Sequence, residues 1–204
     1  MSKENFINGS ILEFKLPHSF GYAYCKVLDF RSIREFDGIL VKVYNHIVTE
    51  PIKDIKILSN EDWLFGARRM PWLPSTRGKG AWRFKGVLVS EDDAIIPDFK
   101  YSITYNPFEE DKSKLGPWHV IRNINQRSKE TYSYDRVMHL EDTVLSPRPA
   151  IERRAAMEYC RIYGIDLKKY FDFNDDANKI VYAQMISIPI YSTIPKKNRG
   201  KALN

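Results

Sequence analysis

The fold is decided near the amino terminus, where the sequence reads GSILEFKL at 9–16, GYAYCKVLDF at 21–30 and GILVKVY at 38–44. In each of these segments apolar side chains recur at every second position, which is the pattern of a strand with one buried face. Pro17 and Gly21 stand where the chain must reverse between the first two segments. Three antiparallel strands in succession are therefore expected.

Small and large side chains alternate between the inner faces of these strands. Ala23 and Cys25 are small, whereas Leu12 and Phe14 on the preceding strand are large. A tightly curled sheet needs such a combination on its inner side. We therefore expect a strongly bent antiparallel sheet that forms a partly open SH3-like barrel.

Further short strands follow, separated by turn dipeptides, and indicate a mainly β body. We expect them at 52–58, 81–89, 101–105, 118–121 and 131–134. Between the first two of these, residues 67–80 contain two prolines and two glycines, which break strands and helices. This segment is expected to be a long loop that aromatic side chains fasten to the body.

The pattern changes at Ser146, which can cap a helix. Apolar residues from Ile151 onward recur at helical spacing, and Gly164 can end the helix. The apolar, β-prone stretch 180–188 predicts one terminal strand, followed by a mobile basic tail from Lys196.

These patterns predict a mainly β fold, α+β overall, with a C-terminal helix and a terminal strand. We divide the chain into a barrel-like domain, 1–145, and an extension, 146–204, packed on it. The sequence contains no apolar run long enough to cross a bilayer and no apolar leader at its start. A cytoplasmic protein with no membrane partner is expected. Its two cysteines are expected to be reduced, buried thiols.

Positive charge is concentrated in two places. The net charge is +6, yet residues 66–90 contain six basic and no acidic side chains, and residues 181–204 contain four basic and no acidic ones. Elsewhere acidic residues outnumber basic ones. The two basic stretches are expected to attract phosphate or an acidic protein surface.

The first basic stretch also contains two tryptophans, Trp72 and Trp82. Tryptophan and arginine dominate binding energy at protein interfaces, and they also stack on bases and neutralise phosphates. Alternatively, Trp72, Trp82 and Phe84 are core residues and the arginines surround them. Tyr22, Tyr24 and Tyr44 form a second exposed aromatic patch or pack under the C-terminal helix. The candidate partner-binding residues are Arg68, Arg69, Trp72, Arg77, Lys79 and Arg83.

No catalytic or metal-binding pattern is present. The four histidines share no ligand spacing, and Gly78-Lys79-Gly80 lacks the other residues of a phosphate-binding loop. We therefore expect a non-enzymatic binding protein without metal or cofactor. A small-molecule enzyme with its pocket at the barrel mouth is a weaker hypothesis.

The opening strands resemble the immunity protein 26 family, in which a glycine and an apolar strand precede a Gly-Tyr-x-x-x-x-Val-Leu strand. Gly21, Tyr22, Val27 and Leu28 match that pattern, and GAWRFKG at 80–86 is similar to a later Trp-x-x-x-Gly strand. The resemblance covers about residues 8 to 125 and defines no functional residues. It implies a mainly β module that binds and neutralises a cognate bacterial toxin domain. Binding of RNA or DNA through residues 66–85 and the tail is the alternative.

Overall fold

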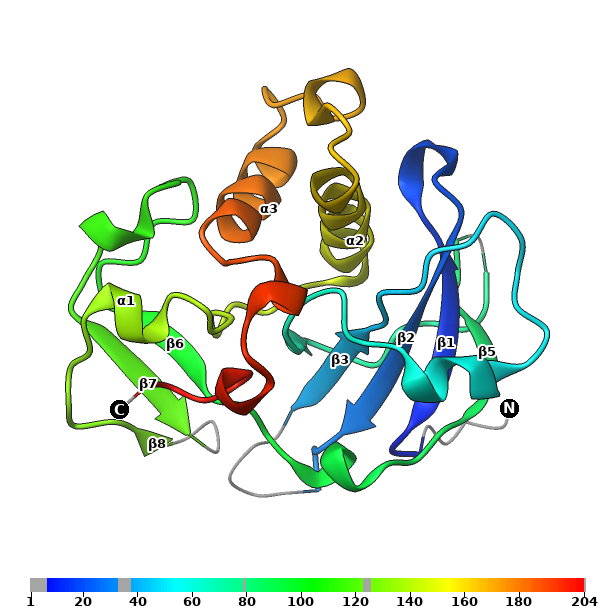
Figure 1. Ribbon diagram of the computed structural model, residues 1–204, viewed down its shortest axis with the longest axis horizontal. Helices are drawn as coiled ribbons and strands as arrows, with labels where there is room; N and C mark the ends of the chain where they lie inside the picture. The colour runs from blue at the N-terminus through cyan, green and yellow to red at the C-terminus, as the bar shows by residue number, and fades with distance from the viewer. Residues whose placement is uncertain (1–6, 33–37, 79, 123–125, 204) are drawn as a thin grey trace.

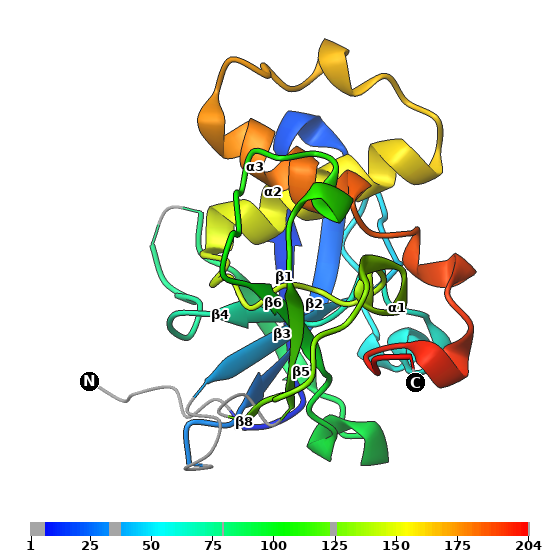
Figure 2. The same cartoon turned by 90° about the vertical axis from the view of Figure 1, so that its left-hand side faces the viewer.

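Two antiparallel sheets lie side by side, and two helices lie above them (Figures 1 and 2). This computed structural model describes residues 7–32, 38–78, 80–122 and 126–203. The larger sheet has the order β4-β3-β2-β1-β5 and the smaller one β6-β7-β8. The strands are β1 (Ser10–Lys15), β2 (Tyr22–Asp29), β3 (Ile39–Val43), β4 (Arg68–Met70), β5 (Arg83–Val87), β6 (Phe99–Ser102), β7 (Trp118–Arg122) and β8 (Gln126–Arg127). The α-helices are α1 (Tyr134–Val137), α2 (Arg148–Ile162) and α3 (Asp176–Ile186).

The first three expected strands are confirmed as β1, β2 and β3, paired in succession. Leu12 lies opposite Cys25 and Phe14 opposite Ala23, so large side chains do face small ones. The mainly β, α+β class is also confirmed. The larger sheet ends in β4 on one side and β5 on the other, so it is not a closed barrel.

The expected terminal strand at 180–188 is wrong, because the stretch up to Ile186 belongs to α3. The Asp175 carboxylate accepts a hydrogen bond from the Ala177 amide at 2.8 Å and caps this helix. Val181 and Met185, four residues apart, then face the core together. A short, continuous apolar run fits a buried strand and a buried helix equally well, so its period could not distinguish them.

The expected strand at 52–58 is also wrong. Residues Ile55–Asn60 form a 3-10 helix, and the Asp54 carboxylate accepts a hydrogen bond from the Lys56 amide. This segment covers one face of the larger sheet, where Ile52 and Leu58 pack on Tyr24 and Tyr44. The two tyrosines therefore form no exposed patch and do not lie under the C-terminal helix.

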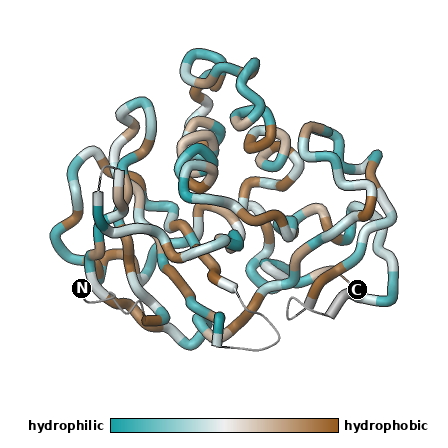
Figure 3. Tube along the Cα trace, turned by 180° about the vertical axis from the view of Figure 1, so that it is seen from behind, coloured by the Kyte–Doolittle hydropathy of each residue, from teal (hydrophilic) through white to brown (hydrophobic). Residues whose placement is uncertain are grey.

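Helix α2 covers the opposite face of the larger sheet. Ile151 and Met157 join Phe14 and Trp82 in one buried cluster. Gly164 follows the helix with a φ of +66°, as a helix-ending glycine should. Beyond it, the connection to α3 is mostly hydrophilic (Figure 3).

The basic tail from Lys196, expected to be mobile, is bound to the body of the protein. The Arg199 guanidinium pairs with Asp62 at 2.7 Å, and the Ala202 amide donates to the Asp98 carboxylate at 3.0 Å. Both cysteines are buried free thiols, as expected. Within the described ranges, no helix combines the length and the apolar character that a bilayer crossing requires.

Lys100 is a buried cation in β6. Its ammonium group donates to the Met138 carbonyl at 2.9 Å and lies 5.8 Å from the centre of the Trp118 ring. Burial lowers the pKa of Lys100 to about 8, although the carboxylates of Asp142 and Glu141 act in the opposite direction. Below that pH the folded protein bears the cost of a buried charge.

We expect this cost to disappear as the pH rises. Between pH 8 and about 10.4 the unfolded chain keeps the Lys100 proton and the folded chain loses it, so stability rises with pH. Urea unfolding of the wild-type protein and of Lys100→Met, from pH 7 to 10, measures this. Above pH 8, the free energy of unfolding of the wild type, measured relative to that of Lys100→Met, should rise by up to about 1.4 kcal/mol per pH unit. A difference that stays constant across this range would contradict it.

Candidate functional site

The basic segment, residues 66–85, is fastened to the body at Trp82. This side chain is 0 % exposed, and its ring stacks on Phe14 with centroids 4.7 Å apart. The indole N–H donates to the Glu152 carboxylate of α2 at 2.8 Å. Burial raises the pKa of Glu152, while this hydrogen bond and Arg148 act to lower it. Trp82 is thus a core residue, as the alternative interpretation held.

Arg68 is the second internal anchor. Its guanidinium is buried and pairs with Glu141 at 2.7 Å and with Asp142 at 3.2 Å. It also donates to the Ser146 hydroxyl at 2.9 Å. Burial by itself would lower the pKa of Arg68, but the carboxylates of Asp142 and Glu141 outweigh it and raise the pKa. Arg68 therefore presents no charge to a partner in this structure and is left out of the candidate surface.

The ion pairs continue from Arg68 into α2. Glu141 lies 3.7 Å from Arg154, which pairs with Glu158 at 2.8 Å. All of these groups are buried, which is costly unless each charge meets a partner. Sequence reasoning missed this network, because Glu141 and Asp142 lie more than 70 residues from Arg68 along the chain.

Arg69 lies half-buried beside the anchor. Its guanidinium donates to the Thr143 carbonyl at 3.3 Å, and its own carbonyl accepts from the Ser146 amide at 2.8 Å. Burial lowers the pKa of Arg69. This residue borders the surface without projecting from it.

The remaining candidates are displayed outward. The Trp72 side chain is 63 % exposed, although Met70 and Pro74 beside it are buried and Leu73 packs on the core. Arg77 and Arg83 are exposed as well. Lys79 lies outside the described residues. The structure thus leaves Trp72, Arg77 and Arg83 as the exposed part of the predicted set.

Apolar side chains on β5 extend this surface. Phe84 is 54 % exposed, and Val87 and Val89 further along are also exposed. The alternative interpretation placed Phe84 in the core together with Trp82, yet only Trp82 is buried. Phe84 lies opposite Leu12, on the same face as Trp82, but at the margin of the sheet, where it stays exposed. After Phe84, an extra residue in β5 opposite Ile11 and Leu12 interrupts the alternation. Gly86 was the sequence feature that could have revealed this irregularity.

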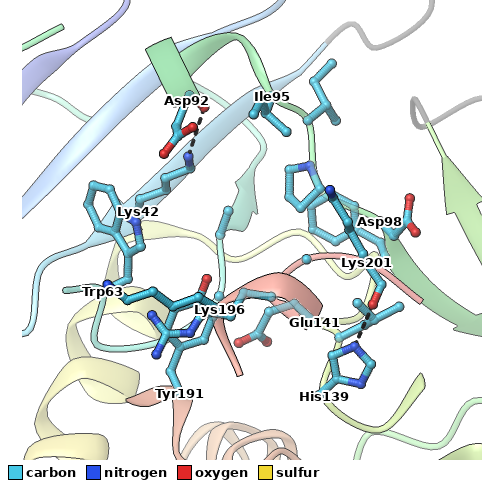
Figure 4. Close-up of a pocket in the computed structure, with 18 of the residues that line it drawn as sticks. Lys42, Trp63, Asp92, Ile95, Asp98, His139, Glu141, Tyr191, Lys196 and Lys201 are labelled. Carbon is cyan, nitrogen blue, oxygen red and sulfur yellow. Dashed lines mark hydrogen bonds between the residues drawn. The ribbon is translucent and has the colours of Figure 1, made fainter. Parts of the chain in front are cut away.

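A cavity of about 490 Å³ lies between the two sheets and the tail (Figure 4). Lys42 and Trp63 line one side, with the Lys42 ammonium 5.5 Å from the indole centre. On the other side the His139 ring N–H donates to the Lys201 carbonyl at 2.7 Å. Lysine and arginine side chains line the cavity in the same number as carboxylates, and Arg199 pairs with Asp62 among them, so no ligand class is favoured. Across the residues that are described, no three His, Cys, Asp or Glu side chains converge as metal ligands would.

Two arginines of the basic segment, Arg68 and Arg83, should differ sharply in their effect on folding. Arg68→Ala would leave Glu141 and Asp142 buried without a partner, and we expect a loss of about 3–5 kcal/mol in the free energy of unfolding. Arg83→Ala, the matched exposed variant, should stay within about 0.5 kcal/mol of the wild type. Denaturant titration of both variants measures this. Similar losses in the two would show that Arg68 is not the anchor described above.

Comparison with known families gives one match. The model of the family described as Immunity protein 26 matches residues 7–111, more than half of the chain. No curated protein and no solved structure matches. The matched region contains β1 to β6, including the basic segment, and leaves α2 and α3 outside. This chain belongs to the immunity protein 26 family.

Proposed function

We propose that this protein is a non-enzymatic inhibitor that binds and neutralises a cognate toxin domain inside the toxin-producing cell. Membership of the immunity protein 26 family supports a protective role. An inhibitor of this kind needs no catalytic group, only a rigid surface with a few anchored side chains.

The exposure of Trp72 is the observation that carries the choice of surface. A tryptophan that is 63 % exposed between residues fixed in the core is preorganised to insert into a partner. Arg77 and Arg83 give the surrounding surface its positive charge. We therefore assign the contact to the exposed part of the basic segment, Trp72, Arg77 and Arg83, with Arg69 at its border.

Binding of nucleic acid is the second candidate, since exposed arginines next to tryptophan also suit bases and phosphates. Two observations weaken this candidate. Arg68 is buried in an ion pair with Glu141, and Arg199 of the second basic stretch pairs with Asp62. Fewer cations are then available to neutralise phosphates.

The gene immediately upstream supplies the test partner, because an immunity protein is encoded beside its toxin. We expect the C-terminal domain of that upstream protein to arrest growth when expressed alone and to be harmless when this chain is co-expressed. The purified pair should form a stable complex in size-exclusion chromatography. Toxicity that persists under co-expression, together with the absence of a complex, would refute the proposal.

The contact surface is tested with point variants. Trp72→Ala should weaken the complex by about 30-fold, the usual effect of removing a hot-spot tryptophan. Ile103→Ala, which removes an exposed apolar side chain next to β6 of the smaller sheet, is the matched control and should bind like the wild type. Isothermal titration calorimetry measures both, and both should melt within a few degrees of the wild type. Equal affinities would place the contact elsewhere.

The same samples separate the two candidate functions. A nucleic-acid protein would shift oligonucleotides at about 50 mM salt and lose this binding steeply as salt rises. We expect no shift at that salt concentration. A shift that depends on Arg77 and Arg83 would favour the alternative.

A further inference from the structure

As far as the described residues show, the larger sheet is open at the edge formed by β5, which adjoins the proposed contact surface. At the opposite edge, β4 is covered, because the Ser146 amide donates to the Arg69 carbonyl at 2.8 Å. In the smaller sheet the outer side of β6 is covered too, since the Lys100 amide donates to the Glu141 carbonyl at 2.9 Å. β5 lies at the end of its sheet (Figure 1) and is exposed or half-exposed along its whole length.

The register of β5 shows which of its backbone groups point away from β1. The Leu88 amide donates to the Gly9 carbonyl, and Gly86 lies opposite Ile11. The backbone N–H and C=O groups of Val87, between these two residues, therefore point away from β1. Beyond the bulge, Trp82 directs its amide outward, to the Ser75 carbonyl. Phe84, two residues further along, has the same orientation.

The outward amides of Phe84 and Val87 are available. Among residues 7–32, 38–78, 80–122 and 126–203, neither amide donates a hydrogen bond to a backbone carbonyl on the outer side. An unpaired row of this kind is a template for one more strand.

The side chains along β5 favour the pairing of an additional strand with this edge. Phe84 and Val87 lie opposite Leu12 and Ser10, on the face of the sheet that α2 covers, and both are exposed at its margin. Of the two basic residues in the strand, Arg83 is exposed, whereas Lys85 turns inward, where its ammonium group donates to the Ile52 carbonyl at 3.0 Å. The strand contains no proline. These are the features of a strand that accepts an extended peptide.

Charge decides between the possible occupants. No acidic residue lies between positions 66 and 90, and Arg83 projects from β5 itself. A second copy of this chain paired edge to edge would bring Arg83 of each molecule against the basic strand of the other, which is unfavourable. An acidic strand from another protein meets no such repulsion.

We propose that an extended segment of the cognate toxin, carrying acidic and apolar side chains in alternation, adds to β5 as a sixth strand of the larger sheet. This inference rests on the proposed function and identifies the segment of the partner that binds to this chain. Backbone hydrogen bonds to Phe84 and Val87 provide the attachment, and Arg83 selects an acidic neighbour.

Amide exchange measured by NMR tests the attachment directly. The probe is a catalytically inactive form of the C-terminal domain of the upstream protein, titrated into the full-length chain. We expect the Phe84 and Val87 amides to exchange fast in the free protein and at least about tenfold more slowly in the complex, because they gain hydrogen bonds. Exchange at these amides that does not slow in the complex would overturn the inference.

Two variants at one position isolate the contribution of the backbone. Val87→Pro and Val87→Ala both remove the isopropyl group, but only proline removes the outward N–H, and neither disturbs a bond to β1. Calorimetry with the same probe should show that Val87→Pro binds at least about tenfold more weakly than Val87→Ala. Equal affinities would overturn the inference, and the exchange measurement still decides if Val87→Pro does not fold.

The outcomes separate this inference from the proposed function. A complex that forms without protection of the β5 amides leaves toxin neutralisation standing and removes strand addition. Failure to form any complex removes both. Sedimentation of the free chain at about 100 µM checks the other occupant, and a dimer that Val87→Pro dissociates would identify a second copy and overturn the proposal.

Discussion

The buried guanidinium of Arg68 constrains the whole arrangement. A charge held away from water must meet opposite charges and hydrogen-bond acceptors, or the folded state loses several kcal/mol. Glu141, Asp142 and Ser146 satisfy that demand. To do so, the chain that follows the smaller sheet must run alongside β4 and start α2 directly above the larger sheet. Met157 of α2 then joins Phe14 in the buried cluster on that face of the sheet.

The same interaction makes the two edges of the larger sheet unequal. Because Arg68 draws residues 141–146 against β4, the Ser146 amide reaches the Arg69 carbonyl and closes that edge. Among the residues that the structure describes, no comparable ion pair draws chain against the outer side of β5, where Lys85 pairs with Glu13 and donates to the Ile52 carbonyl. The asymmetry that leaves β5 open therefore arises from internal charge pairing. The proposed strand addition uses this open edge.

The sequence predicted what local pattern can encode. The alternation of apolar residues, with large Leu12 facing small Cys25, correctly predicted strands β1 to β3. Gly164 correctly predicted the end of α2. Arg68 and Arg83 have the same side chain in the same basic segment, and one is buried while the other is exposed. The difference comes from carboxylates more than 70 residues away, which no charge count in a local window can include. Trp72 and Trp82 differ for a similar reason, because only Trp82 lies where a strand faces α2.

The boundary between the family region and the rest of the chain now has a physical meaning. The family match ends at residue 111, before the carboxylates that neutralise Arg68, although Arg68 itself lies inside it. The network then crosses the boundary expected at residue 145, since Arg154 and Glu158 continue it in α2. The family region of this chain thus contains a buried cation whose partners lie outside that region. The exposed residues of the proposed contact surface, from Trp72 to Val87, all lie inside the match, so the chain beyond residue 111 supports that surface without forming part of it.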